Sequence, residues 1–262
     1  MKKAMHGNST VIKLWFSIAV FALVSIMGIS QMAKAYEDYQ TEQEKGQFTF
    51  IEGEARKQKL DDVYWENAEE NTPVDGGERV KTLISTRAEI QLAELDIIRL
   101  APKTTVEFIK LYQESKDKKR ETEIDVNEGD IWANIGSLDA SSEMDLNTAV
   151  ANATVKGTVF RVNVGEDKST ELKVYKGQVD VKGKAPVGEE PEEPKSKSLA
   201  PKQIEGPKEV TMKEWTVIVR EMQKVIIAAD GQLVASREFS MQDRDEQTEW
   251  VSWNAERDKV MG

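Results

Sequence analysis

Residues 128–164 carry the pattern that decides the fold, and they read EGDIWANIGSLDASSEMDLNTAVANATVKGTVFRVNV. Apolar and polar residues alternate here in short runs that glycine, asparagine and aspartate interrupt. Alternation with a period of two is typical of a strand with one buried face. A glycine inside such a run, as at Gly157, indicates a bulge or a close approach of two backbones. The stretch therefore predicts antiparallel β-structure with sharp turns.

The same pattern extends over residues 46–183. Short β-type runs alternate with turn residues at intervals of about 8–12 residues, which is typical of a sandwich, a barrel or a solenoid. The charged stretch at 114–120 (ESKDKKR) suits the tip of a hairpin. We predict an all-β domain here, and a polar linker over residues 36–45 before it.

The C-terminal part begins with a proline- and glutamate-rich stretch at residues 184–198, which predicts a solvated linker because it cannot bury apolar area. Residues 199–262 are predicted to add a β extension and a helix. Runs at 215–219 and 225–229 predict strands, with a helix over 211–229 as the alternative. Residues 241–260 predict a short helix that places Trp250 and Trp253 on one face, where they would dock onto the core.

The N-terminus has the pattern of an export signal. Four lysines and no acids lie in residues 1–35, and an uncharged apolar run, LWFSIAVFALVSIMGI, fills residues 14–29. The run is followed by a small-residue site that ends at Ala35, which predicts a signal peptide cleaved after that residue. The alternative is an uncleaved membrane anchor over residues 11–29, slightly short for a bilayer. Either reading places the rest of the chain outside the cytoplasm.

The composition excludes several classes of function. The chain of 262 residues has no cysteine and one histidine, His6, so it offers no disulfide, no thiolate nucleophile and no cysteine-based metal site. Its net charge is −11, and residues 36–262 alone carry 32 bases against 47 acids. Such a surface repels phosphates, so we expect no nucleic-acid partner and membrane contact only through the N-terminal segment.

Within residues 46–205 the sequence resembles the FecR domain family. The resemblance rests on a glycine followed by an apolar segment, and on a V-x-G-T-x-F-x-V motif followed by a V-x-x-G-x-V hairpin. The matching residues include Gly129, Trp132, Val155, Gly157, Thr158, Phe160, Val162 and Gly177. The chain departs from the family pattern at Asn147-Thr148-Ala149, where a Thr-Pro usually precedes the alanine, and at Lys156, where arginine is common. These departures concern ligand specificity rather than the fold.

The resemblance implies a FecR-type antiparallel β domain, built as a sandwich or in a solenoid-like way. We interpret the motif residues as structural corners of this fold rather than as an active site. The best-known members of the family are transmembrane regulators of iron-siderophore uptake with a cytoplasmic anti-sigma region. Only 13 residues precede the apolar run here. We therefore expect the stand-alone exported kind, without that region.

For function, the sequence favours a non-enzymatic module for protein interaction, envelope sensing or signalling. We predict no catalytic residue, no cofactor and no metal. The alternative is a structural envelope protein that binds glycan or peptidoglycan through tryptophans such as Trp65 and Trp132, although these rings suit core packing better. A two-carboxylate hydrolase is the least favoured class, since pairs such as Asp61-Asp62 or Glu189-Glu190 show no cleft. Calcium ligands such as Asp139, Asp145 and Asp167 lack a D-x-D-x-D-G loop.

Overall fold

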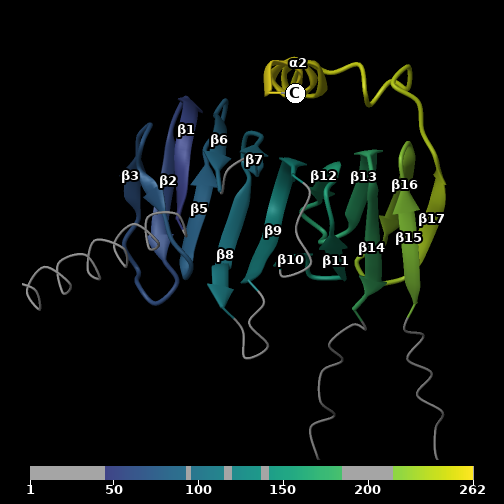
Figure 1. Ribbon diagram of the computed structural model, residues 1–262, viewed down its shortest axis with the longest axis horizontal. Coiled ribbons are helices and arrows are strands. Elements are labelled where there is room, and N and C mark those ends of the chain that lie inside the picture. The colour runs from purple at the N-terminus through teal and green to yellow at the C-terminus, as the bar shows by residue number, and fades with distance from the viewer. Residues whose placement is uncertain (1–44, 93–95, 115–119, 137–141, 185–214, 262) are drawn as a thin grey trace, which may run out of the picture. The chain divides into compact units, whose positions relative to one another are not determined.

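The computed structural model describes residues 45–92, 96–114, 120–136, 142–184 and 215–261. Within them the chain forms 17 strands and one helix, α2 (Glu249–Met261), and all belong to one compact unit (Figure 1). The strands form two sheets, sheet A and sheet B. The predicted all-β fold with a short C-terminal helix is confirmed.

Sheet A has nine strands and lies beneath α2. In spatial order its strands are β4 (Pro73–Val74), β1 (Gly46–Glu52), β6 (Arg87–Gln91), β7 (Ile97–Leu100), the end of β9 (Arg120–Asn134), β12 (Val159–Val164), β13 (Thr170–Lys176), β16 (Gln223–Ile227) and β17 (Leu233–Glu238). All of these pairings are antiparallel, and their register aligns outward side chains into rows across the sheet.

Sheet B is the second layer. In spatial order its strands are β3 (Glu66–Ala68), β2 (Ala55–Lys59), β5 (Glu78–Thr82), β8 (Thr105–Glu114), the start of β9, β10 (Ser142–Asn147), β11 (Ala151–Val155), β14 (Gln178–Gly183) and β15 (Thr216–Arg220). Strand β9 belongs to both sheets: up to Glu128 it pairs with β8, and from Gly129 it pairs with β12. Its bend therefore joins the two layers.

One apolar core fills the space between the sheets. Phe108 and Ile124 contribute from sheet B, and Ile98, Ile131 and Phe160 from sheet A, all fully buried. Alternate residues of each strand point inward, as the period-two pattern predicted. Because the chain has no cysteine, this packing stands without disulfide support.

The chain passes repeatedly from one sheet to the other through sharp corners. Each of the nine crossings that lie within the described residues contains a residue with positive φ, which allows a tight bend. These residues are Gly53, Asn71, Gly77, Ser85, Lys103, Gly129, Gly157, Gly177 and Met222. A left-handed conformation is common for glycine and unusual for the other residue types, so the non-glycine corners must be imposed by the surrounding packing.

Three glycine corners pack directly against corners that carry a threonine. A Cβ built on Gly53 would lie 2.6 Å from Thr86 Oγ1, and one on Gly129 would lie 2.4 Å from Thr104 Oγ1. At the third corner pair, a Cβ on Gly177 would meet the backbone oxygen of Gly157 at 2.7 Å and Thr158 Oγ1 at 3.2 Å. Only glycine allows such an approach.

Each threonine also makes a hydrogen bond to the corner it faces. The backbone N–H of Glu54 donates to Thr86 Oγ1 at 2.9 Å, and that of Asp130 donates to Thr104 Oγ1 at 3.0 Å. Thr158 Oγ1 donates to the carbonyl oxygen of Gln178 at 2.8 Å. These threonines are buried, and each bond satisfies a backbone group at the facing corner. These contacts explain the structural role that we expected for Gly157 and Thr158 of the motif.

Other sequence predictions can be placed on this fold. The strands predicted after residue 214 are observed as β15 and β16, rather than the alternative helix. The C-terminal helix begins later than predicted, at Glu249, because Thr248 Oγ1 caps it by accepting from the N–H of Val251. The predicted signal or anchor, the linkers at 36–44 and 185–198 and the hairpin tip at 115–119 lie outside the described residues. Among those that are described, no helix is long and apolar enough to span a membrane.

Replacing Gly129 with alanine should destabilise the protein strongly. The new Cβ would meet the backbone Cα of Thr104 at 2.5 Å in a residue with φ of +97°. We expect a loss of about 3–5 kcal/mol in the free energy of unfolding, which combines the left-handed penalty with overpacking. Chemical denaturation followed by tryptophan fluorescence measures it.

The matched control is Gly77→Ala. Gly77 also has positive φ, at +83°, but a Cβ there has nothing within 4 Å. This variant should lose only about 1–2 kcal/mol. Equal losses for the two variants would contradict the close packing of corner against corner.

Candidate interaction surface

A row of charged side chains crosses the outer face of sheet A. The register pairs each member with the next on the neighbouring strand. From β6 to β16 the row is Glu89, Arg99, Trp132, Arg161, Lys173 and Lys224. We call it the charged row. Four of its six members are cations, in a chain whose net charge is −11.

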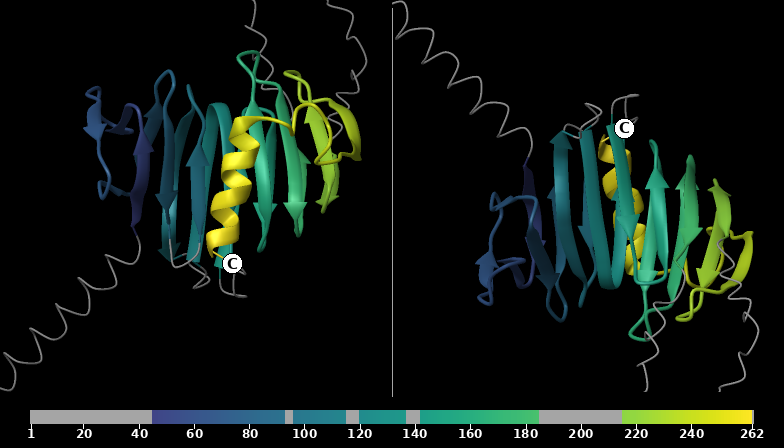
Figure 2. Two further views of the ribbon diagram at one scale, coloured as in Figure 1. Left: turned by 90° about the horizontal axis from the view of Figure 1, so that it is seen from above. Right: turned by 90° about the horizontal axis from the view of Figure 1, so that it is seen from below.

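The C-terminal segment, residues 239–261, covers the charged row. It leaves β17, runs through a series of turns and ends in α2, which lies over the outer face of sheet A (Figure 2). The segment carries six acids against three bases, so its charge is opposite to that of the row. Arg99, Trp132, Lys173 and Lys224 are all buried beneath it.

Arg99 lies at the centre of the interface with α2 and is fully buried. Its Nε donates to Glu89 Oε2 at 2.6 Å, and its Nη1 donates to Asp258 Oδ1 of α2 at 2.7 Å. Arg257 of the helix donates to the Glu89 carboxylate from Nε and from Nη2, each at 2.9 Å. The helix therefore completes an ion network that begins on the sheet. Such charge-assisted bonds fix orientation as well as distance.

A second ion cluster joins the start of the segment to β13 and β16. Lys173 donates to Glu246 Oε1 at 2.6 Å and also contacts Asp245, while Tyr175 Oη donates to Glu246 Oε2 at 2.7 Å. Lys224 donates to Glu171 at 2.9 Å and lies 3.4 Å from Asp245. The side chain of Glu246 is fully buried, so its charge depends on these partners.

The pKa directions follow from this arrangement. Burial acts to lower the pKa of Lys173, but hydrogen bonds to Asp245 and Glu246 raise it above its usual value. The hydrogen bond from Lys173 lowers the pKa of Asp245 to about 2. Burial, together with the charge of Glu246, raises the pKa of the Tyr175 hydroxyl. The three shifts therefore favour a charged Lys173, a charged Asp245 and a neutral Tyr175.

Aromatic rings fill the space between these ion clusters. Trp132 stacks on Tyr175 with ring centroids 4.3 Å apart, and its Nε1 donates to Asp258 at 2.9 Å. Trp250 and Trp253 of α2 stack at 5.5 Å, and Trp253 also contacts Phe50. The prediction that the two helix tryptophans dock onto the body of the protein is therefore confirmed.

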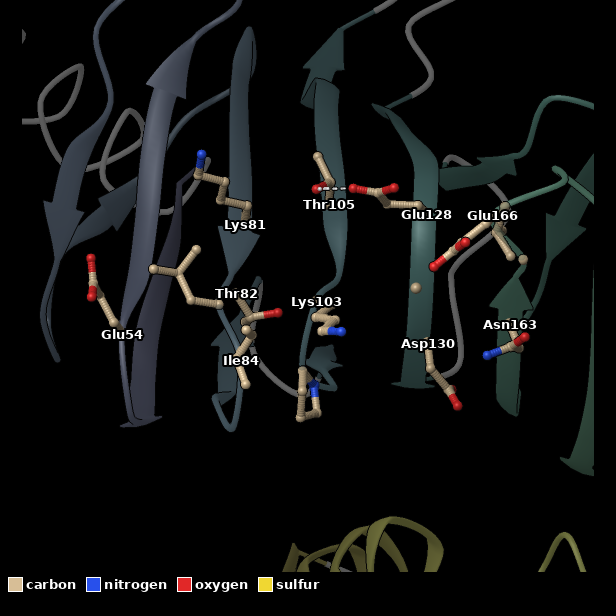
Figure 3. Close-up of a pocket in the computed structure, with 15 residues that line it drawn as sticks. Glu54, Lys81, Thr82, Ile84, Lys103, Thr105, Glu128, Asp130, Asn163 and Glu166 are labelled. Carbon is tan, nitrogen blue, oxygen red and sulfur yellow. Dashed lines mark hydrogen bonds between the residues drawn. The ribbon is translucent and has the colours of Figure 1, made fainter.

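An open groove of about 830 Å³ runs along the edge formed by the corners (Figure 3). Its lining combines acids such as Glu54, Glu128 and Glu166 with Lys81 and Lys103. None of the residues that line it is serine, histidine or cysteine, so the groove offers no nucleophile–base pair of the Ser–His or Cys–His kind. In the part of the chain that the structure describes, no group of three or more acidic or histidine side chains could hold a metal ion.

The motif residues singled out in the sequence take two kinds of position. Gly129, Gly157, Thr158 and Gly177 form corners, and Val155 and Phe160 lie in the core. Trp132 is the exception, since it points outward and lies under α2. Of the tryptophans considered as sugar platforms, Trp65 is partly exposed and lies under the ammonium group of Lys81, 3.8 Å from the ring centroid.

Sequence reasoning missed the charged row. Arg99 in IIRL and Lys173 in ELKVY interrupt apolar runs, which marks them as outward-facing residues. Nothing in the sequence shows that they are aligned with one another, because alignment depends on the register of strands distant in the chain.

Comparison with known proteins supports the resemblance. Residues 78–180 match the family model described as FecR protein. None of the curated proteins matches the chain. The matched range contains all the motif residues named above and five of the six members of the charged row, from Glu89 to Lys173.

Two solved structures are similar to part of the chain. Both are described as "a putative anti-sigma factor from Parabacteroides distasonis ATCC 8503", at 1.65 Å and 2.50 Å resolution. Each is 16% identical to this chain with a TM-score of 0.42, and the match covers 63% of this chain. The chain spans 61% of the length of those proteins.

Lowering the pH should weaken the interface between α2 and sheet A through Glu89. Burial alone would raise the pKa of Glu89, but hydrogen bonds from Arg257 and Arg99 lower it from 4.5 to about 2. The carboxylate therefore stabilises the fold above pH 4.5, and this contribution is lost as the pH falls from about 4.5 to about 2. By pH 3 the loss from this group should be about 2 kcal/mol.

Urea unfolding at pH 6 and at pH 3 tests this expectation. Glu89→Gln should lose about 2 kcal/mol less than the wild type between the two conditions. Glu52→Gln, which changes a carboxylate with 54% of its side chain exposed on the same sheet, serves as the control and should behave as the wild type does. Equal pH dependence for Glu89→Gln and the wild type would show that the pairing with Arg99 and Arg257 does not lower the pKa of Glu89.

Proposed function

We propose that this protein is a non-enzymatic FecR-domain module that works outside the cytoplasm, where it binds another protein in envelope sensing or signalling. One observation carries the proposal. Apart from Trp132, the residues that identify the FecR domain form corners and core, and none lines a catalytic cleft with a nucleophile and its base. The family pattern therefore describes a scaffold, and the function belongs to the faces that this scaffold presents.

The outer faces of the two sheets differ in a way that suits recognition. On sheet A the charged row lies under the C-terminal segment, whereas sheet B carries carboxylates and amides together with cations such as Arg79 and Lys110. On sheet B, Asn147 donates to Asp125 at 2.8 Å and Thr154 donates to Asp145 at 2.7 Å. Ordered polar faces favour specific protein contacts, since charge complementarity steers partners and excludes wrong ones.

The location outside the cytoplasm is supported by the N-terminal sequence. Residues 1–35 combine a basic start, an apolar run and a small-residue site, which is the order of a secretory signal. The chain also contains no cysteine, so any thiol introduced by mutation is the sole thiol in the protein. This property makes the location directly measurable.

Glu70→Cys should react with a membrane-impermeant maleimide in cells whose cytoplasmic membrane is intact. Residue 70 is exposed, so the thiol will be accessible wherever the domain is located. Ile98→Cys, at a fully buried position, is the matched control and should react only after denaturation. Labelling of Glu70→Cys only after lysis would contradict a location outside the cytoplasm.

The interaction itself can be tested in the same cells with a photoreactive residue at Ile218 on sheet B or Val234 on sheet A. Both side chains are exposed, at 42% and 64%. We expect a discrete crosslinked product with an envelope protein from one of these faces. A chain that is exported and folded but gives no protein adduct from either face would count against an interaction module.

A further inference from the structure

We infer that the charged row is a binding surface for an acidic, aromatic-bearing helical segment of a partner protein, and that residues 239–261 occupy it as an exchangeable internal ligand. The inference rests on the proposed function, because it names the face through which the module binds. It adds the chemistry of the partner and a mode of control.

The charge of the row needs a partner. Arg99, Arg161, Lys173 and Lys224 lie side by side on four different strands, and like charges in such a row repel one another unless acids lie between them. The sheet itself supplies Glu89, Asp130 and Glu171, three acids for four cations. Asp245, Glu246 and Asp258 of the C-terminal segment supply three more. The surface is therefore complementary to an acidic segment, and the chain's own C-terminus shows the docking mode.

The C-terminal segment satisfies the row only in part. Arg99 is fully buried, yet its Nη2 has no hydrogen-bond partner among the residues that the structure describes. Arg161 pairs with Asp130 of the sheet through Nε and Nη2, but its Nη1 makes no hydrogen bond there and lies 3.9 Å from Glu246. A buried donor without an acceptor is destabilising, because it has lost its hydrogen bonds to water. A ligand with an acceptor at these two positions would bind the row better than the present cover does.

The cover is also weakly built. Helix α2 has 13 residues, a length that is marginal for an isolated helix in water, so it depends on docking for its stability. Its fully buried residues are few, Val251 and Asn254, and the turns before it bury Phe239 and Glu246. An interface held by ion pairs gains less stability than an apolar one of the same size, but it gains orientation and selectivity. These properties suit a segment that can leave the sheet.

Release of the segment would change only one face of the protein. The strands under α2 already pair with their neighbours and keep their inner side chains in the core. Detachment would therefore expose the charged row without disrupting the two sheets. A tethered ligand competes with a free one at an effective concentration of about 1 mM for short linkers. An external segment must bind better, or be present locally at high concentration, to displace it.

The test uses a synthetic fluorescent peptide with the sequence of residues 239–262. We expect it to bind a chain that ends at Glu238, and to bind the full-length chain about 100-fold more weakly if its own dissociation constant is about 10 μM. Fluorescence anisotropy measures both affinities. A peptide in which Glu246 and Asp258 are replaced by lysine should not bind.

Two further variants keep the test decisive if the shortened chain does not fold. Full-length Glu246→Gln/Asp258→Asn retains the segment but removes two of its charges, so it should bind the wild-type peptide at least 10-fold more tightly than the wild-type chain does. Adding Lys224→Gln to that variant should weaken peptide binding, whereas adding Lys182→Gln on the exposed face of sheet B should not.

Three results would overturn the inference. They are equal binding by the full-length and weakened-cover chains, no binding by a folded shortened chain, and a full-length dimer that exchanges α2 between two copies in place of binding peptide. None of these would exclude a protein adduct from Ile218 on sheet B in cells, which would still support the proposed function. The binding surface on sheet A and the proposed function can thus fail independently.

Discussion

The structure depends on one repeated contact, a glycine corner packed against a threonine corner. Gly129 approaches Thr104 so closely that no side chain fits between them, and the Thr104 hydroxyl accepts the backbone N–H that follows the glycine. This contact lets β9 leave sheet B and enter sheet A without an unpaired buried backbone group. Because such corners recur along the chain, two sheets can stack around one core without disulfides.

The corners also determine what the outer face of sheet A presents. Once each strand enters the sheet at a fixed residue, its register is set, and one residue from each of the six strands from β6 to β16 falls into the charged row. A slip of one residue would turn Arg99 into the core and Ile98 to the surface. The corners therefore determine whether the charged row forms at all. The C-terminal segment docks on a surface whose side chains are positioned by the same strands that form the core.

The sequence predicted the scaffold better than the surface. Glycine inside an alternating pattern identified the corners at Gly129, Gly157 and Gly177, because only glycine tolerates that backbone conformation so closely packed. The corners at Ser85, Lys103 and Met222 were not predicted, since their positive φ is imposed by packing and leaves no trace in residue type. The charged row was missed for a related reason: Glu89 and Lys224 lie 135 residues apart in the chain, and only the register of the intervening strands aligns them.

Hydrogen exchange in the full-length chain tests the central claim most directly, that a stable two-sheet scaffold carries a separable C-terminal cover. The account predicts that the amides of α2 exchange through a local opening with a lower free energy than the amides of β7 and β9 beneath it. Peptide added in excess should then change the exchange of α2 and leave that of the sheet strands unaltered. Exchange of α2 only through global unfolding, with the same free energy as β7 and β9, would contradict the account.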